Sequence, residues 1–243
     1  DRLRSRGLGD VYKRQPLMLG NICQQLYTMV DTMVVGQVAG VEALAALGAV
    51  DFLMWVVTGI STGLTQGFSI QLSQYYGAKD FENLRKSLAH SYRLTAFIAA
   101  GVLILSQSFA SLVLTGLHTP SNIIGMSLLY LRIIFCGIPA TAAYNMFASA
   151  LRAMGNSKTP LTAMIIASVL NVSLDILFVA GFGWGVAGAA IATVIAQSFS
   201  AVYCFLILRR IDIVHLTRAD FMPASGMNAR LMKLGIPVVF QNI

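Results

Sequence analysis

Two carboxylates stand inside long apolar stretches of the sequence, where a charged side chain is costly. Asp31 lies within the stretch 16–38 and Asp175 within the stretch 161–182. A carboxylate inside a membrane helix costs about 2.5–3.5 kcal/mol on insertion scales, so it is expected to hold an ion or a proton, or to pair with a buried cation. Arg132 is the one cation within the apolar stretches that could form such a pair. The two aspartates are therefore the first candidates for a functional site.

Polar residues accompany each aspartate at the spacing of a helix face. Asn171 precedes Asp175 by one turn, which places the amide and the carboxylate on the same face. Gln24, Tyr27 and Asp31 form a similar stripe, which we expect to turn away from lipid. Oxygen-rich groups of this kind suit a hard cation such as Na⁺. We therefore expect the two helices to face each other, with Gln24 and Tyr27 as candidate cavity-lining residues.

A second polar stripe lies in the apolar stretch 52–71, beside a row of glycines. The glycines recur every four residues, a spacing that allows close packing of membrane helices. We interpret the hydroxyl groups as donors between helices in preference to substrate contacts, because Ser and Thr often join membrane helices in this way. The hydroxyl residues are Thr58, Thr62, Thr65 and Ser69, and the glycines are Gly59, Gly63 and Gly67.

The composition requires lipid as the solvent for most of these side chains. Hydrophobic residues make up 56% of the 243 residues and charged residues only 11%, with a mean hydropathy of +0.72. Six apolar stretches are each long enough to cross a hydrocarbon core of about 30 Å as a helix. They span residues 16–38, 52–71, 94–114, 123–147, 161–182 and 186–208, and a seventh begins at Leu231. The predicted fold class is an all-α membrane protein with six transmembrane helices and the start of a seventh.

Two local features modify this pattern. Pro139 falls inside the fourth helix and should kink it, because proline cannot donate a backbone hydrogen bond. Asp80 can cap a short helix after the second transmembrane helix. Phe81, Leu84 and Leu88 share one face of that short helix. We expect it to lie in the plane of the lipid headgroups.

The basic residues indicate the orientation in the membrane. All 17 Lys and Arg residues except Arg132 lie on one side of the predicted membrane. By the positive-inside rule, the amino terminus and these connectors are cytoplasmic, which predicts a multi-pass protein of the cell inner (plasma) membrane. The net charge of +7 is therefore explained without nucleic-acid binding. The sequence has no P-loop and no metal-binding pair of histidines or cysteines, so we expect no cofactor and no ATP-driven step.

Paired aspartates could alternatively form the catalytic dyad of an intramembrane aspartyl protease. Such an enzyme needs a Gly-x-Gly-Asp sequence on a membrane helix, whereas Val172, Ser173 and Leu174 precede Asp175. The one match, at residues 7–10, lies in a charged stretch where no membrane helix can form. The sequence therefore favours a protein that is not an enzyme.

The chain divides into four segments. Our hypothesis is that the basic leader 1–15 is non-native, since it has neither the apolar core of a signal peptide nor an initiator Met. Residues 16–210 form a six-helix lobe, and residues 211–230 form a cytoplasmic connector. The pattern Pro-x4-Asn-Ile at Pro16 recurs at Pro237, which indicates an internal repeat. Residues 231–243 are then expected to begin the first helix of a second lobe.

Four motifs in this order resemble the multidrug and toxic compound extrusion (MATE) family of transporters. They are GNICQQLYTMVDTMVVG at 20–36, QYYGAK at 74–79, LRAMGNSKTP at 151–160 and GVAGAAIAT at 185–193. The resemblance covers residues 16–243 and implies an antiporter of twelve helices in two six-helix lobes. Such a protein exchanges Na⁺ or H⁺ for small amphipathic or cationic compounds. This chain would be the first lobe, with membrane lipid around it and the missing second lobe as its partner.

The resemblance also implies which residues form the site. In the prokaryotic branch of the family, a polar cluster in the first lobe binds the coupling cation. The matching positions are Asp31, Asn145, Asn171, Asp175 and Thr193. Tyr130 is a further candidate for lining the same cavity. Flippases of lipid-linked sugars share this architecture and are the alternative function.

Overall fold

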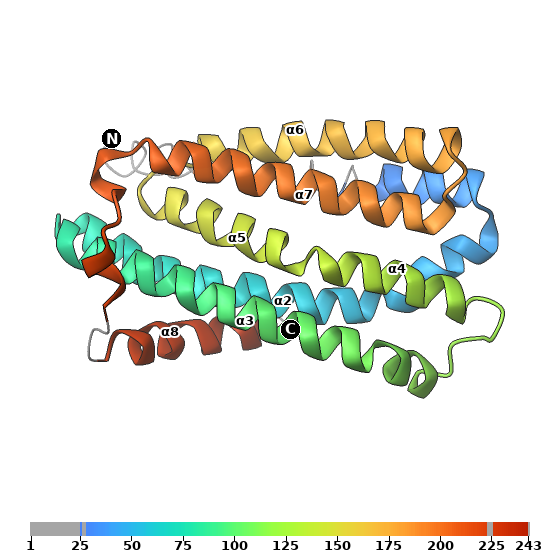
Figure 1. Ribbon diagram of the computed structural model, residues 1–243, viewed down its shortest axis with the longest axis horizontal. Coiled ribbons are helices and arrows are strands. Elements are labelled where there is room, and N and C mark those ends of the chain that lie inside the picture. Colours follow the sequence, from blue (N-terminus) through green and yellow to red (C-terminus); the bar gives the residue numbers. More distant parts are fainter. Residues whose placement is uncertain (1–24, 26–27, 223–225, 243) are drawn as a thin grey trace, which may run out of the picture.

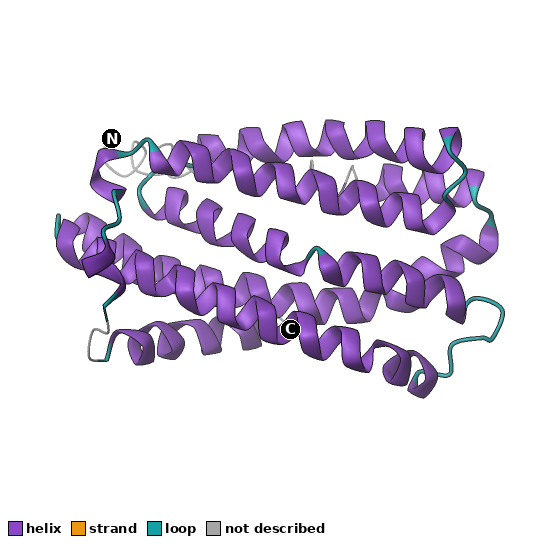
Figure 2. Cartoon of the chain, in the orientation of Figure 1, coloured by secondary structure: helices purple, strands orange, loops and turns teal. Residues whose placement is uncertain are grey.

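The computed structural model describes residues 25, 28–222 and 226–242, and this part of the chain is helical without β-strands (Figure 2). Residues 28–38 are helical and precede α2. The other helices are α2 (Val41–Gly77), α3 (Phe81–Gly116), α4 (Ile124–Cys136), α5 (Ile138–Ala153), α6 (Lys158–Asp175), α7 (Gly185–Arg209) and α8 (Met227–Asn242). A π-helical segment, η1 (Ile176–Gly181), continues α6, and the short helices η2 (Asp212–Val214) and η3 (Arg218–Phe221) follow α7. The long helices run side by side, with α5 between α7 and α3 (Figure 1).

The apolar lengths of these helices match a membrane. Among the described residues, α2, α3, α6 with η1, and α7 are each long and apolar enough to cross a bilayer, and the bent pair α4 and α5 adds a fifth span. The sixth expected span, 16–38, lies partly outside the described residues. Phe97, Ile104 and Leu112 of α3 are 65–71% exposed, as expected for side chains that face lipid. The predicted all-α membrane fold is confirmed.

The predicted kink is also confirmed. Helices α4 and α5 meet at Gly137 with a bend of 44°, and Pro139 stands in the first turn of α5. A Cβ atom at Gly137 would lie 2.6 Å from Cγ2 of Val194 on α7. The break therefore combines a proline that cannot continue the hydrogen-bond ladder with a glycine that lets α7 approach closely.

The separate headgroup helix predicted after Asp80 is wrong. Asp80 does cap a helix, since its carboxylate accepts a hydrogen bond from the backbone nitrogen of Asn83 at 3.2 Å. Hydrogen bonding from the Asn83 side chain lowers the pKa of the Asp80 carboxyl. That helix, however, is the start of α3, which continues unbroken into the membrane. Leu84 and Leu88 are buried in a core shared with Leu231 of α8, so protein covers the apolar face that we assigned to lipid.

The connector between α7 and α8 is held against α3. The Nε2 atom of His90 lies 3.1 Å from the backbone oxygen of Met222, and Arg93 donates to the backbone oxygen of Phe221 at 3.1 Å. Within the connector, the Asp220 carboxylate accepts hydrogen bonds from both the backbone nitrogen and the hydroxyl of Thr217. These contacts place the beginning of α8 beside α3.

The glycine row of α2 packs directly on α8. A Cβ atom at Gly67 would lie 2.3 Å from the Cα of Gly235, and one at Gly63 would lie 2.6 Å from the Cα of Val239. Real Cβ atoms do not approach backbone atoms this closely, so the two helices meet only because these α2 positions carry no side chain. The close helix packing predicted for the glycine row is confirmed at Gly63 and Gly67.

Candidate functional site

Three of the predicted site residues meet where α6 ends and η1 begins. Asp175 is fully buried and Asn171 is 2% exposed. In the orientation that satisfies both ends of the Asn171 amide, its nitrogen lies 3.2 Å from Oδ2 of Asp175 and its oxygen 3.3 Å from the backbone nitrogen of Thr193. The one-turn spacing of Asn171 and Asp175 therefore produces a direct contact, and α7 supplies the third residue.

The π-helical segment η1 starts immediately after Asp175. Such segments insert an extra residue into the turn and often occur at functional sites. Gly188 of α7 packs against this segment, since a Cβ atom at Gly188 would lie 3.1 Å from the backbone carbon of Phe178. The close approach of α7 brings Thr193, farther along the same helix, to the carboxyl-terminal end of α6, where Asp175 lies.

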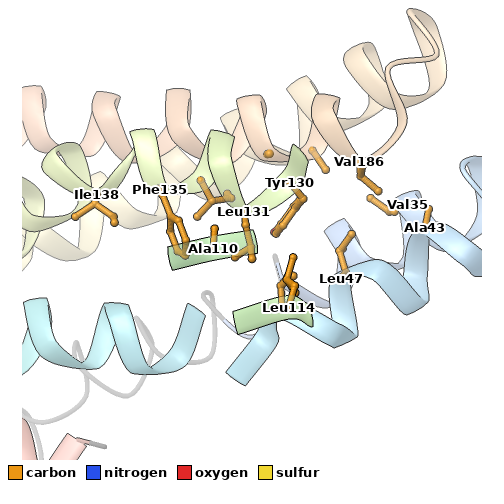
Figure 3. Close-up of a cluster of buried hydrophobic side chains, with 14 of the residues drawn as sticks. Val35, Ala43, Leu47, Ala110, Leu114, Tyr130, Leu131, Phe135, Ile138 and Val186 are labelled. Carbon is orange, nitrogen blue, oxygen red and sulfur yellow. The ribbon is translucent and has the colours of Figure 1, made fainter. Parts of the chain in front are cut away.

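Asp31 reaches the same region from the helix at residues 28–38. Its side chain is 7% exposed. One turn after Asp31, Val35 points into the apolar cluster that also contains Tyr130 and Val186 (Figure 3). This cluster fixes the first helix against the start of α7 and so positions Asp31.

Each aspartate has one buried oxygen atom that accepts no hydrogen bond from the described residues: Oδ1 of Asp31 and Oδ1 of Asp175. A buried carboxylate oxygen without a donor is strongly unfavourable unless it is protonated or close to a cation. Arg132 does not supply the charge, because its side chain is exposed on α4 and forms no ion pair with either aspartate. The arrangement is therefore one that can accept a proton or a metal cation.

Asn145 lies apart from Asn171 and Asp175. Its amide nitrogen donates to the hydroxyl of Thr62 on α2 at 3.2 Å. Asn145 lines a cavity of about 300 Å³ between α2, α4, α5 and α7, and Thr193 lies on the wall of the same cavity. Thr193 also lines a smaller cavity with Asn171. The structure thus places Thr193 between Asn145 and the pair on α6.

The hydroxyl groups of α2 differ from our interpretation as interhelical donors. Thr58, Thr65 and Ser69 donate to backbone oxygens three or four residues earlier in their own helix. Such bonds satisfy a hydroxyl within one apolar helix, so no partner helix is needed. Of the four residues, Thr62 has a hydrogen bond to another helix, which it accepts from the Asn145 amide, and both Thr58 and Thr62 line the larger cavity.

Two further polar residues line this region and were not predicted from the sequence. Gln197 follows Thr193 by one turn of α7 and lines both cavities, and its Oε1 atom is buried with no hydrogen-bond donor among the described residues. Tyr144 also lines both cavities, and its hydroxyl lies 3.5 Å from the backbone oxygen of Pro160. The four-residue spacing of Thr193 and Gln197 was the signal that could have identified Gln197.

The remaining predicted residues lie elsewhere. Tyr130 is 8% exposed within the apolar cluster of Figure 3, and it does not line the two cavities described above. Gln24 and Tyr27 lie outside the described residues, so their predicted role stays a prediction.

The fold and the buried carboxylates define a multi-pass membrane protein with an intramembrane polar site. A family model described as MatE matches residues 16–177, and the chain belongs to this family of transporters. The family assignment confirms the sequence resemblance and the expectation that the protein is not an enzyme. The intramembrane protease alternative therefore falls away.

Similar proteins are known from both sequence and structure. The chain is 31% identical to "Probable multidrug resistance protein YpnP" of Bacillus subtilis over 226 residues, which cover 93% of this chain and 51% of that protein. It is 33% identical to "Probable multidrug resistance protein YoeA" of the same organism, over 91% of this chain and 50% of the relative. The chain thus spans about half the length of the curated relatives that it matches.

Solved structures of transporters are also similar to this chain over about half of their own length. A structure described as MATE in the bent conformation matches with a TM-score of 0.88 and 26% identity, over 94% of this chain and 51% of that one. A transporter of the MOP superfamily from Pyrococcus furiosus matches with a TM-score of 0.87 and 25% identity, over 93% of this chain and 50% of that one. The multidrug resistance names of the sequence relatives do not favour the flippase alternative.

Proposed function

We propose that the full-length protein is a secondary active antiporter of the inner membrane, which exports small amphipathic or cationic compounds in exchange for Na⁺ or H⁺. The observation that carries this proposal is the pair of buried carboxylates, Asp31 and Asp175, each with an oxygen that lacks a donor among the described residues. A membrane protein without ion coupling has no need for two such groups in one apolar lobe.

The coupling cation would bind among oxygen atoms of five side chains. Asp31 and Asp175 would supply the charge, and Asn171 and Thr193 would supply neutral oxygens next to Asp175. Asn145 would contribute from the opposite side of Thr193, after a rotation that releases it from Thr62. Hard oxygen ligands of this kind accommodate Na⁺, and the carboxylates alone can hold a proton.

Binding of either cation would remove the repulsion between the two aspartates and let their helices pack more closely. The access state with the closer helices would then be favoured when the cation is bound. A substrate in the adjacent cavity, lined by Asn145 and Gln197, would favour the other state. Such opposite preferences are sufficient to couple the two fluxes.

The proposal is tested by ethidium efflux from membrane vesicles that contain the full-length gene product. A Na⁺ gradient and a pH gradient are imposed in separate experiments, so that each acts without the other. We expect at least one gradient to drive efflux above the rate in vesicles without the protein. The same rate of ethidium efflux with a Na⁺ gradient, with a pH gradient and with no gradient would contradict ion-coupled export.

We also propose that the amino terminus and the connectors after α2, α5 and α7 are cytoplasmic, because these segments carry the basic residues. In a full-length protein whose native cysteines are replaced by alanine, single cysteines at Lys79 and Lys158 should resist an impermeant thiol reagent added to intact cells. A cysteine at His118 should react. Labelling of the Lys79 position in intact cells would show that the chain has the opposite orientation.

A further inference from the structure

A groove runs along α5 between α3 and α7, away from the polar site. Both neighbouring helices pack on α5, and among the described residues no Cα atoms of α3 and α7 lie within 8 Å of each other. Small side chains form much of the lining, including Ala142 and Ala143 of α5, and the enclosed volume is about 370 Å³. Ala96 and Ala100 of α3 line the groove and are exposed, so it opens to the outside of the lobe.

Aromatic rings and a cation close the cytoplasmic end of the groove. The Tyr92 ring packs edge-on against Phe147 with centroids 5.4 Å apart, and Phe147 lies 5.2 Å from Phe205. The guanidinium carbon of Arg209 lies 5.6 Å from the Phe205 centroid. Arg209 is the exposed last residue of α7, on the side of the lobe that carries the basic connectors. An apolar groove that ends at a cation complements an amphiphile with an anionic headgroup.

A polar group inside the groove also lacks a partner. Thr95 lines the groove one turn deeper than Tyr92, and its side chain is 9% exposed. Its hydroxyl oxygen makes no hydrogen bond with the described residues. A buried hydroxyl in apolar surroundings normally has a partner. A lipid carbonyl in the groove would accept this hydrogen bond once the Thr95 hydroxyl turns toward it.

We propose that this groove binds one anionic phospholipid of the cytoplasmic leaflet, with one acyl chain along α5. Arg209 binds the headgroup phosphate, and Thr95 donates to an ester carbonyl. The described lining residues come from α3, α5 and α7, and they include none of the predicted cation ligands. The lipid site is therefore independent of the proposed ion coupling and can be tested without a transport assay.

The test uses the full-length protein, purified and exchanged into nanodiscs that contain phosphatidylglycerol and phosphatidylcholine in equal amounts. Native mass spectrometry after release from the nanodiscs counts the lipids that stay bound. We expect the wild-type protein to retain phosphatidylglycerol in preference to phosphatidylcholine. Arg209→Gln should lower the retained phosphatidylglycerol about five-fold, the effect of one basic residue near an anionic lipid surface.

Two further variants separate this site from other sources of binding. Arg210→Gln removes the same charge from the neighbouring exposed position and should leave retention unchanged. Ala143→Phe fills the groove and should displace the lipid in a protein that remains monodisperse. Equal loss in Arg209→Gln and Arg210→Gln would show only diffuse attraction to the basic surface and overturn the proposal. Equal retention of the two lipids, or unchanged retention in Ala143→Phe, would overturn it as well.

Discussion

In the full-length protein, Asp31→Asn and Asp175→Asn are each expected to reduce ion-gradient-driven efflux at least tenfold. Both substitutions keep the shape of the side chain and remove the charge. At a distance of about 4 Å, a unit charge contributes on the order of 4 kcal/mol to holding a cation in a partly buried site. A neutral ligand contributes only about 0.5–1.5 kcal/mol, so Thr193→Ala should have a clearly smaller effect. Efflux is compared at matched expression, with the gradient that drives the wild-type protein.

Ser173→Ala is the matched control for these variants. Ser173 lies on α6 between Asn171 and Asp175, but its side chain is exposed and its hydroxyl donates to the backbone oxygen of Val169. Efflux by this variant should equal that of the wild-type protein. Unchanged gradient-driven efflux in both aspartate variants would show that Asp31 and Asp175 do not form the cation site, whatever the effect of Thr193→Ala.

Gly67→Ala is expected to lower the thermal unfolding midpoint of the full-length protein and to impair efflux. The added Cβ atom would lie 2.3 Å from the Cα of Gly235, so α2 and α8 would have to separate along their contact. Overpacking of this kind typically costs about 1–3 kcal/mol. The contact involves backbone atoms on both helices, so rotation of a side chain cannot relieve the clash. The midpoint is measured in detergent at constant protein concentration.

Gly48→Ala is the control on the same helix. A Cβ atom at Gly48 would have no heavy atom within 4 Å, and the position is exposed. Alanine is favoured over glycine within a helix by about 0.8–1.0 kcal/mol, so this variant should be unchanged or slightly more stable. Equal midpoints for Gly67→Ala and Gly48→Ala would show that α2 and α8 are not in contact in the full-length protein.

Much of the fold could be predicted from the sequence because transfer into lipid depends on the residues of each segment. The apolar stretches gave the positions of the transmembrane helices, and Pro139 gave the bend. The helix ends were less accurate, since α2 was predicted over 52–71 and extends over Val41–Gly77. Ala43 and Leu47 near its start are buried against other helices, and hydropathy does not record such packing.

The site could be predicted where neighbours on one helix determine it. Asn171 and Asp175 were paired by their one-turn spacing, and the structure brings the two side chains into contact. The burial of Asp31 could likewise be expected from its place in an apolar stretch. Asn145 and Thr193 were predicted to belong to the site from the family resemblance, because no spacing along the chain relates these residues to Asp175.

Only the tertiary structure decided how the helices are rotated and how closely they approach. It placed Asn145 against Thr62, put Gln197 on the wall of both cavities, and joined the predicted headgroup helix to α3 under the cover of α8. The sequence by itself determined which segments enter the membrane and which carboxylates they bury, because insertion is a property of each segment. Contacts between helices depend on side chains far apart in the chain, where small residues such as Gly67 and Gly188 set the distance between backbones.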